Sequence, residues 1–467
     1  MENFQGSKNF ALGNPEKHAV WRRFQEVLSG RGREAAIFYP DGTVARTFGG
    51  LREEAERWSG IFASAGAKVV GIQTGNTPAW PGVLLGAWQA GCTVVPMDLD
   101  LTGERRNRVE VLCGMTHRVV RRDGEPVMET AAGVAADRRP AADLLKLTSG
   151  STGDPRAVRF TEAQLMADAD HVCESMGIRG GDVNYGVISF AHSYGFSNLV
   201  TPLLCRGIPL VAAEDSIPQA IVRGLAASGA TVFPGVPAHF RTLAQLTPVP
   251  ERLRLCISAG ARLAADTARS FAERWGRKVH SFYGASECGG ICYDAGEERE
   301  VPEGYVGAPL KGVTLEPVAD ESGRIRVRSR AVGLGYWPED AEELAGGVFH
   351  PADLLEKRAE GYVITGRESD LINVAGRKVN PAEVEAVLRR CPGVHDVVVL
   401  GLPAPLRGEE VAACVTGSAS EETLRRFCGD HLASWQSPRR WIFLEEIPVN
   451  ARGKVSRADL RRRLGGG

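Results

Sequence analysis

The sequence predicts an α/β protein with a large N-terminal part and a small α+β C-terminal part. Over the first two thirds of the chain, short apolar runs alternate with helical patterns, which is typical of parallel strands covered by helices. From about residue 304, short alternating strands separated by Gly and Pro turns replace that rhythm. The last stretch, from about residue 367, reads as a compact segment of mixed helices and strands.

The N-terminal rhythm is clearest at its start. Val69–Ile72 is a short apolar run that predicts a buried strand, Trp80–Ala90 predicts a helix, and Cys92–Pro96 predicts the next strand. Strand–helix–strand repetition at this spacing favours parallel sheets. The same alternation predicts further elements at 183–190, 194–205, 208–213, 219–228 and 230–233.

The C-terminal third contains shorter strands and fewer helices. Pro381 suits the first position of a helix that we expect to run to Arg390. We place a domain boundary near residues 366–370, which divides the chain into an N-terminal domain, 1–366, and a small lid domain, 367–467. The other elements expected in this third are strands at 313–318, 324–328, 362–365, 394–401 and 440–444, and a helix at 420–433.

Composition narrows the class of protein. A chain of 467 residues suggests two or three packed units, and 43% hydrophobic with 24% charged residues is typical of a globular protein. The formal net charge of -1 provides no field that would attract nucleic acid or an acidic membrane. The basic run that includes Arg457 and Arg461–Arg463 is interpreted as a solvated helix face, not as a nucleic-acid site.

The pattern of cysteines and the length of the apolar runs predict the cellular compartment of the protein. The ten cysteines are scattered without a paired CxxC set, which favours the reducing cytoplasm. Residues 1–18 are polar and lack the charged-then-apolar pattern of a signal peptide. The longest apolar stretches are too short to span a membrane.

Cys288 and Cys292, near His280, are a weak zinc candidate because a second ligand pair at proper spacing is missing.

The strongest local signal is the run from Leu147 to Arg156, which reads LTSGSTGDPR. Its glycines let backbone N–H groups approach an anion, and its hydroxyls can donate to phosphate oxygens. A flexible linker would not be flanked by strand-like apolar residues on both sides, as this run is. The pattern GxxxxGK[ST] is absent, so we expect phosphate binding by an architecture other than a P-loop.

Three other segments carry chemistry. In Phe282–Glu287 an aromatic beside a glycine offers a face to a flat base, and a hydroxyl followed by a carboxylate suits phosphate and Mg²⁺. Gly361–Arg367 precedes a run of polar and glycine positions that extends to Glu385. Pro448–Val455 places Lys454 on a Gly-containing loop, where a lysine is ordinarily solvated but can also serve an anionic transition state.

These four segments, in this order and spacing, resemble the AMP-forming acyl-adenylate superfamily, which includes acyl-CoA synthetases, nonribosomal peptide adenylation domains and luciferases. The resemblance extends from about residue 20 to residue 464. It implies a large N-terminal domain of two α/β subdomains plus a β-subdomain, and a small mobile C-terminal domain that rotates between two half-reactions. It also implies ATP and Mg²⁺ as cofactors, a small carboxylic acid as substrate and a thiol as acceptor.

The resemblance assigns a role to individual residues of this chain. Ser286 would contact the α-phosphate, Glu287 would hold Mg²⁺, and Lys454 would bridge the substrate carboxylate and the α-phosphate. Asp353 and Arg367 would reach the ribose. The loop around Gly376 would line the thiol tunnel, and the β- and γ-phosphates would lie on Thr148, Ser149, Gly150, Ser151, Thr152 and Gly153. The adenine would lie along Gly260, Ala261 and Arg262, with Tyr283 stacked on it and Gly284 and Ala285 beside it.

The acyl pocket is expected around Phe190–Gly195 and the segment from Gly284 to Gly290. Amino-acid-activating relatives commonly place an Asp in the first of these segments, whereas this chain has no carboxylate there, which argues against an amino acid. Gly289 and Gly290 leave space that suits an aryl or medium acyl group. His192 contacts the acid, gates the tunnel or simply packs in its loop. The pocket residues that the resemblance implies are His192, Ser193, Val236, Gly284 and Gly289.

Three departures from the family pattern bear on function. Arg156 stands where the family often has a lysine, so the charge is kept but not the compact ammonium geometry. Ser369 stands where the hinge is usually Asp or Lys. Ala352 precedes Asp353 where the family usually has Gly, so only the aspartate transfers.

The sequence thus predicts a ligase that activates a carboxylic acid to acyl-AMP, releases pyrophosphate and passes the acyl group to coenzyme A. The alternative acceptor is the phosphopantetheine arm of an acyl carrier protein. Two other readings stay open: a nucleotide-binding homologue without activity, and an adenylating enzyme that stops at acyl-AMP or transfers to an amine. Pyrophosphate release separates the first of these from an enzyme, and the absence of a thioester identifies the second.

Overall fold

The computed structural model describes residues 18–131, 140–149, 155–247, 250–299, 302–318, 323–374, 377–404, 408–448, 455 and 457–465. By its contacts the chain divides into two compact units. Unit 1 consists of Met1–Val301, Gly307–Thr314 and Val327–Phe349, and unit 2 of Pro302–Val306, Leu315–Arg326 and His350–Gly467. The boundary expected at 366–370 falls inside unit 2, and the division into 1–366 and 367–467 stays a prediction.

One sheet of unit 1 has seven strands in the order β18-β8-β7-β4-β3-β5-β6. The pairs β3–β4, β3–β5 and β4–β7 are parallel, as the strand–helix rhythm predicted, and β8 and β6 are antiparallel additions. The strands are β3 (Val69–Gln73), β4 (Thr93–Pro96), β5 (His117–Arg122), β6 (Glu125–Thr130), β7 (Leu144–Ser149), β8 (Pro155–Phe160) and β18 (Gly335–Trp337).

A second sheet of unit 1 runs in the order β2-β1-β10-β9-β11-β12-β13-β14. Its pairs from β1 to β13 are parallel, while β2 and β14 are antiparallel to their neighbours. The strands are β1 (Ala35–Phe38), β2 (Val44–Thr47), β9 (Asn184–Gly186), β10 (Leu210–Ala212), β11 (Val232–Gly235), β12 (Leu255–Ser258), β13 (Val279–Ala285) and β14 (Gly289–Tyr293).

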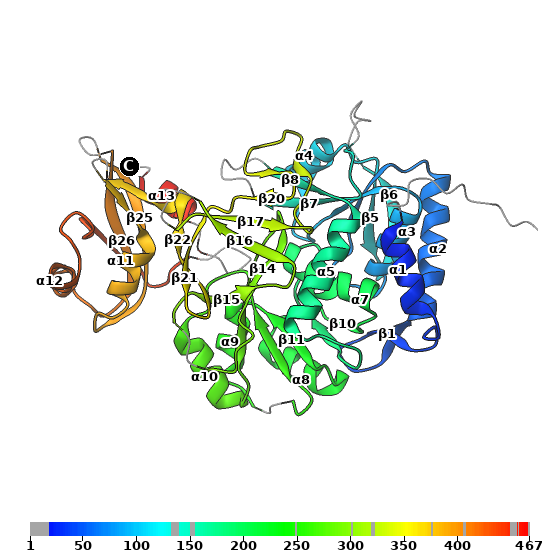
Figure 1. Ribbon diagram of the computed structural model, residues 1–467, viewed down its shortest axis with the longest axis horizontal. Helices are drawn as coiled ribbons and strands as arrows, with labels where there is room; N and C mark the ends of the chain where they lie inside the picture. Colours follow the sequence, from blue (N-terminus) through cyan, green and yellow to red (C-terminus); the bar gives the residue numbers. More distant parts are fainter. Residues whose placement is uncertain are drawn as a thin grey trace, which may run out of the picture. The chain divides into compact units, whose positions relative to one another are not determined.

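Helices pack on both sheets, and α1, α5 and α7 lie side by side in Figure 1. Trp80 on α3 meets Phe190 and Phe196 edge to face at ring-centroid distances of 5.9 and 6.0 Å, which fixes the start of the expected acyl segment. The helices are α1 (Ala19–Leu28), α2 (Phe48–Ser64), α3 (Trp80–Gln89), α4 (Gly103–Cys113), α5 (Glu162–Met176), α6 (Ser193–Gly195), the π-helix η1 (Phe196–Val200), α7 (Thr201–Arg206), α8 (Pro218–Ser228), α9 (Pro237–Leu243) and α10 (Ala265–Trp275).

Short strands follow β14, in the region that the sequence predicted to be β-rich, and the first of them, β15 (Tyr305–Pro309), extends the second sheet by pairing antiparallel with β14. Val327 on β17 lies opposite Phe349 on β20, and Leu344 on β19 pairs with that same Phe349. The other strands are β16 (Val313–Pro317), β17 (Ile325–Ser329), β19 (Leu344–Ala345) and β20 (Val348–Phe349).

Unit 2 contains an antiparallel hairpin, β21–β22, and a small sheet in the order β24-β23-β26-β25, with β27 parallel to β26. One face of this sheet packs on α11 and α12 around Val384, Leu388 and Leu424, and the other packs on Leu460 of α13. The elements are β21 (Asp353–Arg358), β22 (Gly361–Arg367), the 3-10 helix η2 (Glu368–Asp370), β23 (Ile372–Val374), β24 (Arg377–Val379), α11 (Pro381–Leu388), β25 (Val394–Ala404), β26 (Gly408–Gly417), α12 (Glu421–His431), β27 (Arg440–Phe443) and α13 (Arg457–Gly465).

The structure bears on two further expectations. Across the residues described above, no helix combines the length and the apolar composition needed to cross a membrane.

All ten cysteines are buried free thiols. Burial raises the pKa of both Cys288 and Cys292, and His280 Nδ1 lies 2.8 Å from the carbonyl oxygen of Asp294. Within the described part of the chain no group of three His, Cys, Asp or Glu side chains could hold a metal, so the weak zinc candidate gains no support.

Candidate functional site

The expected phosphate loop connects two paired strands. Thr148 lies opposite Arg156 and Ser149 lies opposite Pro155 in the antiparallel pair β7–β8, and the Thr148 hydroxyl donates to the Arg156 carbonyl at 3.4 Å. The flanking apolar residues form this hairpin because they are buried, Leu145 completely. Gly150, Ser151, Thr152 and Gly153 lie outside the described residues, so their phosphate-binding role stays a prediction.

The second motif lies between β13 and β14. Tyr283 pairs with Cys292, Gly284 with Gly290, and Ala285 with Gly289, which leaves Ser286 and Glu287 in the turn between these strands. Two glycines are required here. A Cβ on Gly284 would lie 2.6 Å from the Gly289 carbonyl oxygen, and Gly289 has a φ of +69° with Asp168 Oδ1 2.1 Å from the place of a Cβ.

Glu287 is held at its backbone and at its side chain by one segment. Its carbonyl oxygen accepts from the Gly333 N–H at 2.8 Å, and its Oε1 accepts from the Tyr336 hydroxyl at 3.2 Å. The guanidinium carbon of Arg156 lies 4.1 Å from the centre of the Tyr336 ring. The departure at position 156 therefore has a defined place, stacked on the phenol that donates to Glu287.

The expected acyl segment meets the nucleotide segment. The Ser193 hydroxyl donates to the Ser286 hydroxyl at 2.9 Å, although the two residues come from separate motifs. His192 Nδ1 lies 3.3 Å from Asp98 Oδ2, and the other oxygen of Asp98 accepts from the Ser189 hydroxyl at 2.8 Å. His192 thus has a carboxylate partner from the loop after β4, and its role toward the acid stays a prediction.

The buried side-chain amide of Asn76 fixes the backbone that leads into the expected acyl segment. Its Nδ2 donates to the carbonyl oxygens of Gly186, Ile188 and Ala213 at 2.8 to 3.1 Å, and its Oδ1 accepts from the Phe190 N–H at 2.9 Å. Because Asn76 follows β3 and these acceptors lie at or just after the ends of β9 and β10, the amide joins the ends of strands from both sheets. It holds the backbone that leads to His192.

The expected adenine segment follows β12. Ser258 and Ala259 are buried, whereas Gly260, Ala261 and Arg262 are exposed. Gly260 has a φ of +85°, and a Cβ there would lie 3.7 Å from Val236, so the adenine segment and a predicted pocket residue are neighbours. The structure therefore gathers the unit 1 site residues onto the ends of β7, β12 and β13 and the segment after β9.

Two ionisable side chains, those of Lys146 and Asp168, lie buried behind this site. Lys146 on β7 is 3% exposed, with its ammonium 4.7 Å from the Phe160 ring centre and 5.3 Å from that of Phe196. Burial lowers the pKa of Lys146, and the charge of Asp168 opposes that shift. Asp168 accepts from the Gly290 N–H at 2.9 Å and from the Ser197 hydroxyl. This aspartate fixes the glycine strand that the sequence assigned to the acyl pocket.

In unit 2 the two predicted ribose residues are neighbours. Asp353 and Arg367 lie opposite each other in the β21–β22 pair, with Arg367 Nε 3.7 Å from Asp353 Oδ1. The Arg367 side chain is 58% exposed and that of Asp353 27%, so both can be reached by a ligand. Gly366 leaves room for Asn380, whose Oδ1 would lie 2.5 Å from a Cβ there and whose side chain caps α11.

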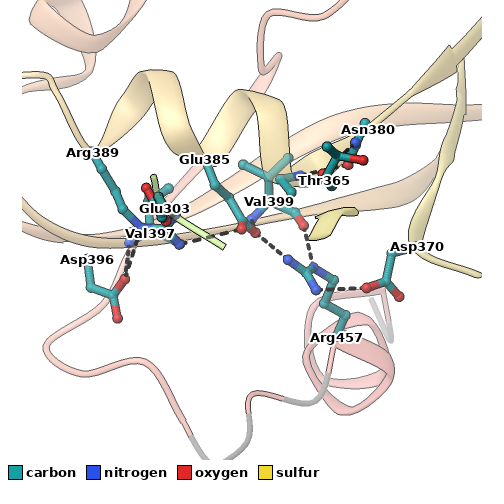
Figure 2. Close-up of polar contacts among 11 residues, drawn as sticks. Glu303, Thr365, Asp370, Asn380, Glu385, Arg389, Asp396, Val397, Val399 and Arg457 are labelled. Atoms are coloured by element: carbon teal, nitrogen blue, oxygen red, sulfur yellow. Dashed lines mark hydrogen bonds and ion pairs between the residues drawn. The ribbon is translucent and has the colours of Figure 1, made fainter. Parts of the chain in front are cut away.

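Arg457 is not on a solvated face, contrary to the reading of the basic tail. Figure 2 shows its guanidinium between three elements: it donates to Asp370 at 2.8 Å, to Glu385 at 2.6 Å and to the Val399 carbonyl oxygen at 3.0 Å. Glu385 is 6% exposed and also accepts from the Val399 N–H. This network fixes the first turn of α13, three residues after Lys454, to α11, β25 and the segment that follows Ser369.

Some site residues were missed by the sequence reasoning and others remain untested. Asp98, Asn76 and Tyr336 carry no motif of their own, since each acts on a partner far away in the sequence. Lys454 and Gly376 lie outside the part of the chain that the structure describes. Their roles remain predictions.

Comparison with known proteins gives the class. A family model for the AMP-binding enzyme matches residues 24–146 and 144–337, and one for the AMP-binding enzyme C-terminal domain matches residues 383–454. A feruloyl-CoA synthase of Amycolatopsis sp is 27% identical over 471 residues, covering 91% of this chain and 95% of that protein. An uncharacterised acyl-CoA ligase of Bacillus subtilis is 26% identical over 426 residues, covering 85% and 88%. The ATP-bound structure of MatB from Rhodopseudomonas palustris superposes with a TM-score of 0.83 at 23% identity, covering 96% and 98%.

The family models and the relatives define an adenylate-forming ligase. The chain belongs to the AMP-binding enzyme family. The predicted resemblance, the mixed α/β class with a large N-terminal and a small C-terminal part, and the expectation of an acid-activating ligase are confirmed.

Proposed function

We propose that this enzyme activates a carboxylic acid with ATP in the site of unit 1 described above and transfers the acyl group to the thiol of coenzyme A. The acid carboxylate attacks the α-phosphorus, the bond to pyrophosphate breaks, and acyl-AMP forms. The thiol sulfur then attacks the acyl carbon, its proton is lost, and AMP leaves. A carboxylate alone would have to expel oxide, so adenylation supplies the leaving group.

The observation that carries this proposal is the contact between Ser193 and Ser286 at 2.9 Å. One serine belongs to the expected acyl segment and the other to the expected nucleotide segment. Adenylation needs the acid oxygen and the α-phosphorus next to each other, and much of the rate of such a reaction comes from positioning. Two hydroxyls within hydrogen-bonding distance bring the expected acyl segment and the expected nucleotide segment next to each other.

The charges of the two anionic reactants must be offset. Glu287 offers a hard oxygen ligand of the kind Mg²⁺ prefers, and its carboxylate is already oriented by Tyr336. Bound Mg²⁺ would supply positive charge to the phosphate oxygens. Lys454 is assigned the attacking carboxylate and the α-phosphate, where a positive charge stabilises the transition state. Asp353 and Arg367 are assigned the ribose.

The acid is assigned to the aryl or medium acyl class. The expectation that Gly289 and Gly290 leave open space is not supported, because Asp168 occupies the place of a Cβ on Gly289 and Leu310 and Phe282 occupy that of a Cβ on Gly290. Asp98, a carboxylate beside the acyl segment, is already bound to Ser189 and His192, which does not favour a role as the partner of an α-ammonium group. A feruloyl-CoA synthase among the relatives supports the aryl choice.

The test is pyrophosphate release from ATP and Mg²⁺ with aryl, short, medium and long carboxylic acids, each with and without coenzyme A. We expect acid-dependent release, strongest with aryl or medium acyl acids, and a thioester only when coenzyme A is present. Replacing coenzyme A with a phosphopantetheinylated carrier protein tests the alternative acceptor.

Two results would contradict the proposal in different ways. ATP binding without pyrophosphate release for any acid would favour the silent nucleotide-binding homologue. Release without a thioester to either thiol would favour an enzyme that stops at acyl-AMP or transfers to an amine.

A further inference from the structure

The backbone of Glu287 alone does not fix the position of its carboxylate. It lies in the turn between β13 and β14, its side chain is partly exposed, and a glutamate loses substantial rotamer freedom when it is fixed. A carboxylate that binds a metal is usually oriented by a hydrogen bond to one of its oxygens. The structure provides such a donor, the hydroxyl of Tyr336, at 3.2 Å from Oε1.

The Tyr336 phenol is suited to remain a donor. Its side chain is 8% exposed. A carboxylate only accepts hydrogen bonds, so the phenol is the donor in this contact. Arg156 stacks on the ring at 4.1 Å, and a planar guanidinium suits such a stack better than a compact ammonium does.

The strand that carries Tyr336 is fixed from several sides. Tyr336 pairs with Val158 of β8, and the N–H groups of Gly333 and Leu334 donate to the carbonyl oxygens of Glu287 and Arg159, each at 2.8 Å. The next residue in the strand, Trp337, donates its Nε1–H to the Leu112 carbonyl oxygen at 2.8 Å. The position of the phenol is therefore set by the fold and not by the carboxylate of Glu287.

We propose that Tyr336 is a positioning residue for the metal-binding carboxylate of Glu287, and that Arg156 steadies the phenol by stacking on its ring. This inference rests on the proposed function, since it takes Glu287 as the Mg²⁺ ligand. It also gives the arginine that departs from the family pattern a role of its own. Tyr336 itself touches neither the acid nor the phosphates in this role.

The experiment is calorimetric titration of ATP into the full chain at a series of Mg²⁺ concentrations, without acid, so that no turnover occurs. The quantity compared is the Mg²⁺ concentration at which the Mg²⁺-dependent gain in ATP affinity is half complete. Removing the donor in Tyr336→Phe is expected to raise this concentration about tenfold. ATP affinity without Mg²⁺ is expected to stay unchanged. Tyr185→Phe, at a phenol 1% exposed on β9, is the matched control and should titrate as wild type.

A double-mutant cycle separates positioning from a general structural effect. If Tyr336 acts through Glu287, adding Tyr336→Phe to Glu287→Gln should change the Mg²⁺ response less than twofold. Should Tyr336→Phe fail to fold, Arg156→Met takes its place, with an expected rise of about threefold in the Mg²⁺ requirement.

Three outcomes would overturn the inference. The first is a Tyr336→Phe titration that matches wild type, the second is a shift of equal size in the Glu287→Gln background, and the third is an Arg156→Met substitute without effect. Each of these leaves the proposed function intact if wild type still binds ATP in a Mg²⁺-dependent way. A wild-type titration with no Mg²⁺ dependence would instead remove the metal role of Glu287 and this inference with it.

Discussion

Replacing Arg457 with methionine should loosen unit 2 around the start of α13. The guanidinium donates to Asp370, to Glu385 and to the Val399 carbonyl oxygen, and methionine keeps most of the volume but none of these bonds. The loss matters most at Glu385, because its side chain is 6% exposed and would keep its charge without its nearest cation.

The size of the effect follows from these contacts. Breaking a buried ion pair by removing one partner typically costs about 3–5 kcal/mol. Glu385 would retain the Val399 N–H at 2.8 Å and Arg389 at 3.5 Å, which places the expected cost at the lower end, about 3 kcal/mol. A local opening free energy reduced by that amount corresponds to amide exchange about a hundredfold faster.

Hydrogen exchange read by mass spectrometry is the assay, with peptides from β25, α11 and α13 as reporters and peptides from β3 and β4 of unit 1 as internal controls. The matched variant is Arg425→Met, which removes an arginine paired with Glu421 at 2.6 Å on the exposed face of α12. Such an exposed pair contributes about 0–1 kcal/mol. Unchanged exchange in Arg457→Met, or equal acceleration in both variants, would refute the reasoning.

Three other substitutions test separate parts of the account. Gly289→Ala should lower the free energy of unfolding by about 2 kcal/mol or more, because its φ is +69° and the methyl group would collide with a buried carboxylate, as a denaturation midpoint would show. Burial lowers the pKa of His239 to about 4, so between pH 6.5 and pH 4 only the unfolded chain takes up that proton. Wild type should lose up to about 3 kcal/mol over that pH window relative to His239→Gln, as urea midpoints would show. Lys454→Ala should abolish pyrophosphate release while thioester formation from supplied acyl-AMP continues.

Each of these three predictions has a control variant or a result that would contradict it. Gly276 has a φ of +62° but nothing within 4 Å of a Cβ, so Gly276→Ala should lower the free energy of unfolding by only about 1 kcal/mol. If the two substitutions lowered it equally, the collision with Asp168 would not explain the cost at Gly289. A stability difference between wild type and His239→Gln that stays constant with pH would show that this histidine titrates normally. Equal loss of both half-reactions in Lys454→Ala would contradict its assignment to the first step.

The sequence predicted the repeating elements well because they depend on local patterns. The strand at Val69–Ile72, the helix at Trp80–Ala90 and the helix from Pro381 all occur within a few residues of their expected bounds. Their apolar periodicity and the proline at a first helical position are properties of neighbouring residues. The motifs around Thr148 and Tyr283 were found for the same reason.

What the sequence could not supply is the set of partners that hold these motifs. Tyr336 reaches Glu287 only because β18 pairs with β8, and Asp98 reaches His192 only because strands of two sheets end near each other. Arg457 was read as a solvated residue because its sequence neighbours are basic, whereas the carboxylates that bury it come from Asp370 and Glu385. Such pairings depend on chain topology, which no local pattern contains.

The central claim, that the acid carboxylate attacks the α-phosphorus of ATP, is tested most directly with an acid labelled with ¹⁸O in its carboxylate. The enzyme, ATP, Mg²⁺, coenzyme A and the best acid from the panel would be incubated, and the AMP analysed by mass spectrometry. The account predicts AMP that carries one ¹⁸O atom, because the attacking oxygen stays on phosphorus when the thiol displaces AMP. Unlabelled AMP, or ADP in its place, would contradict it.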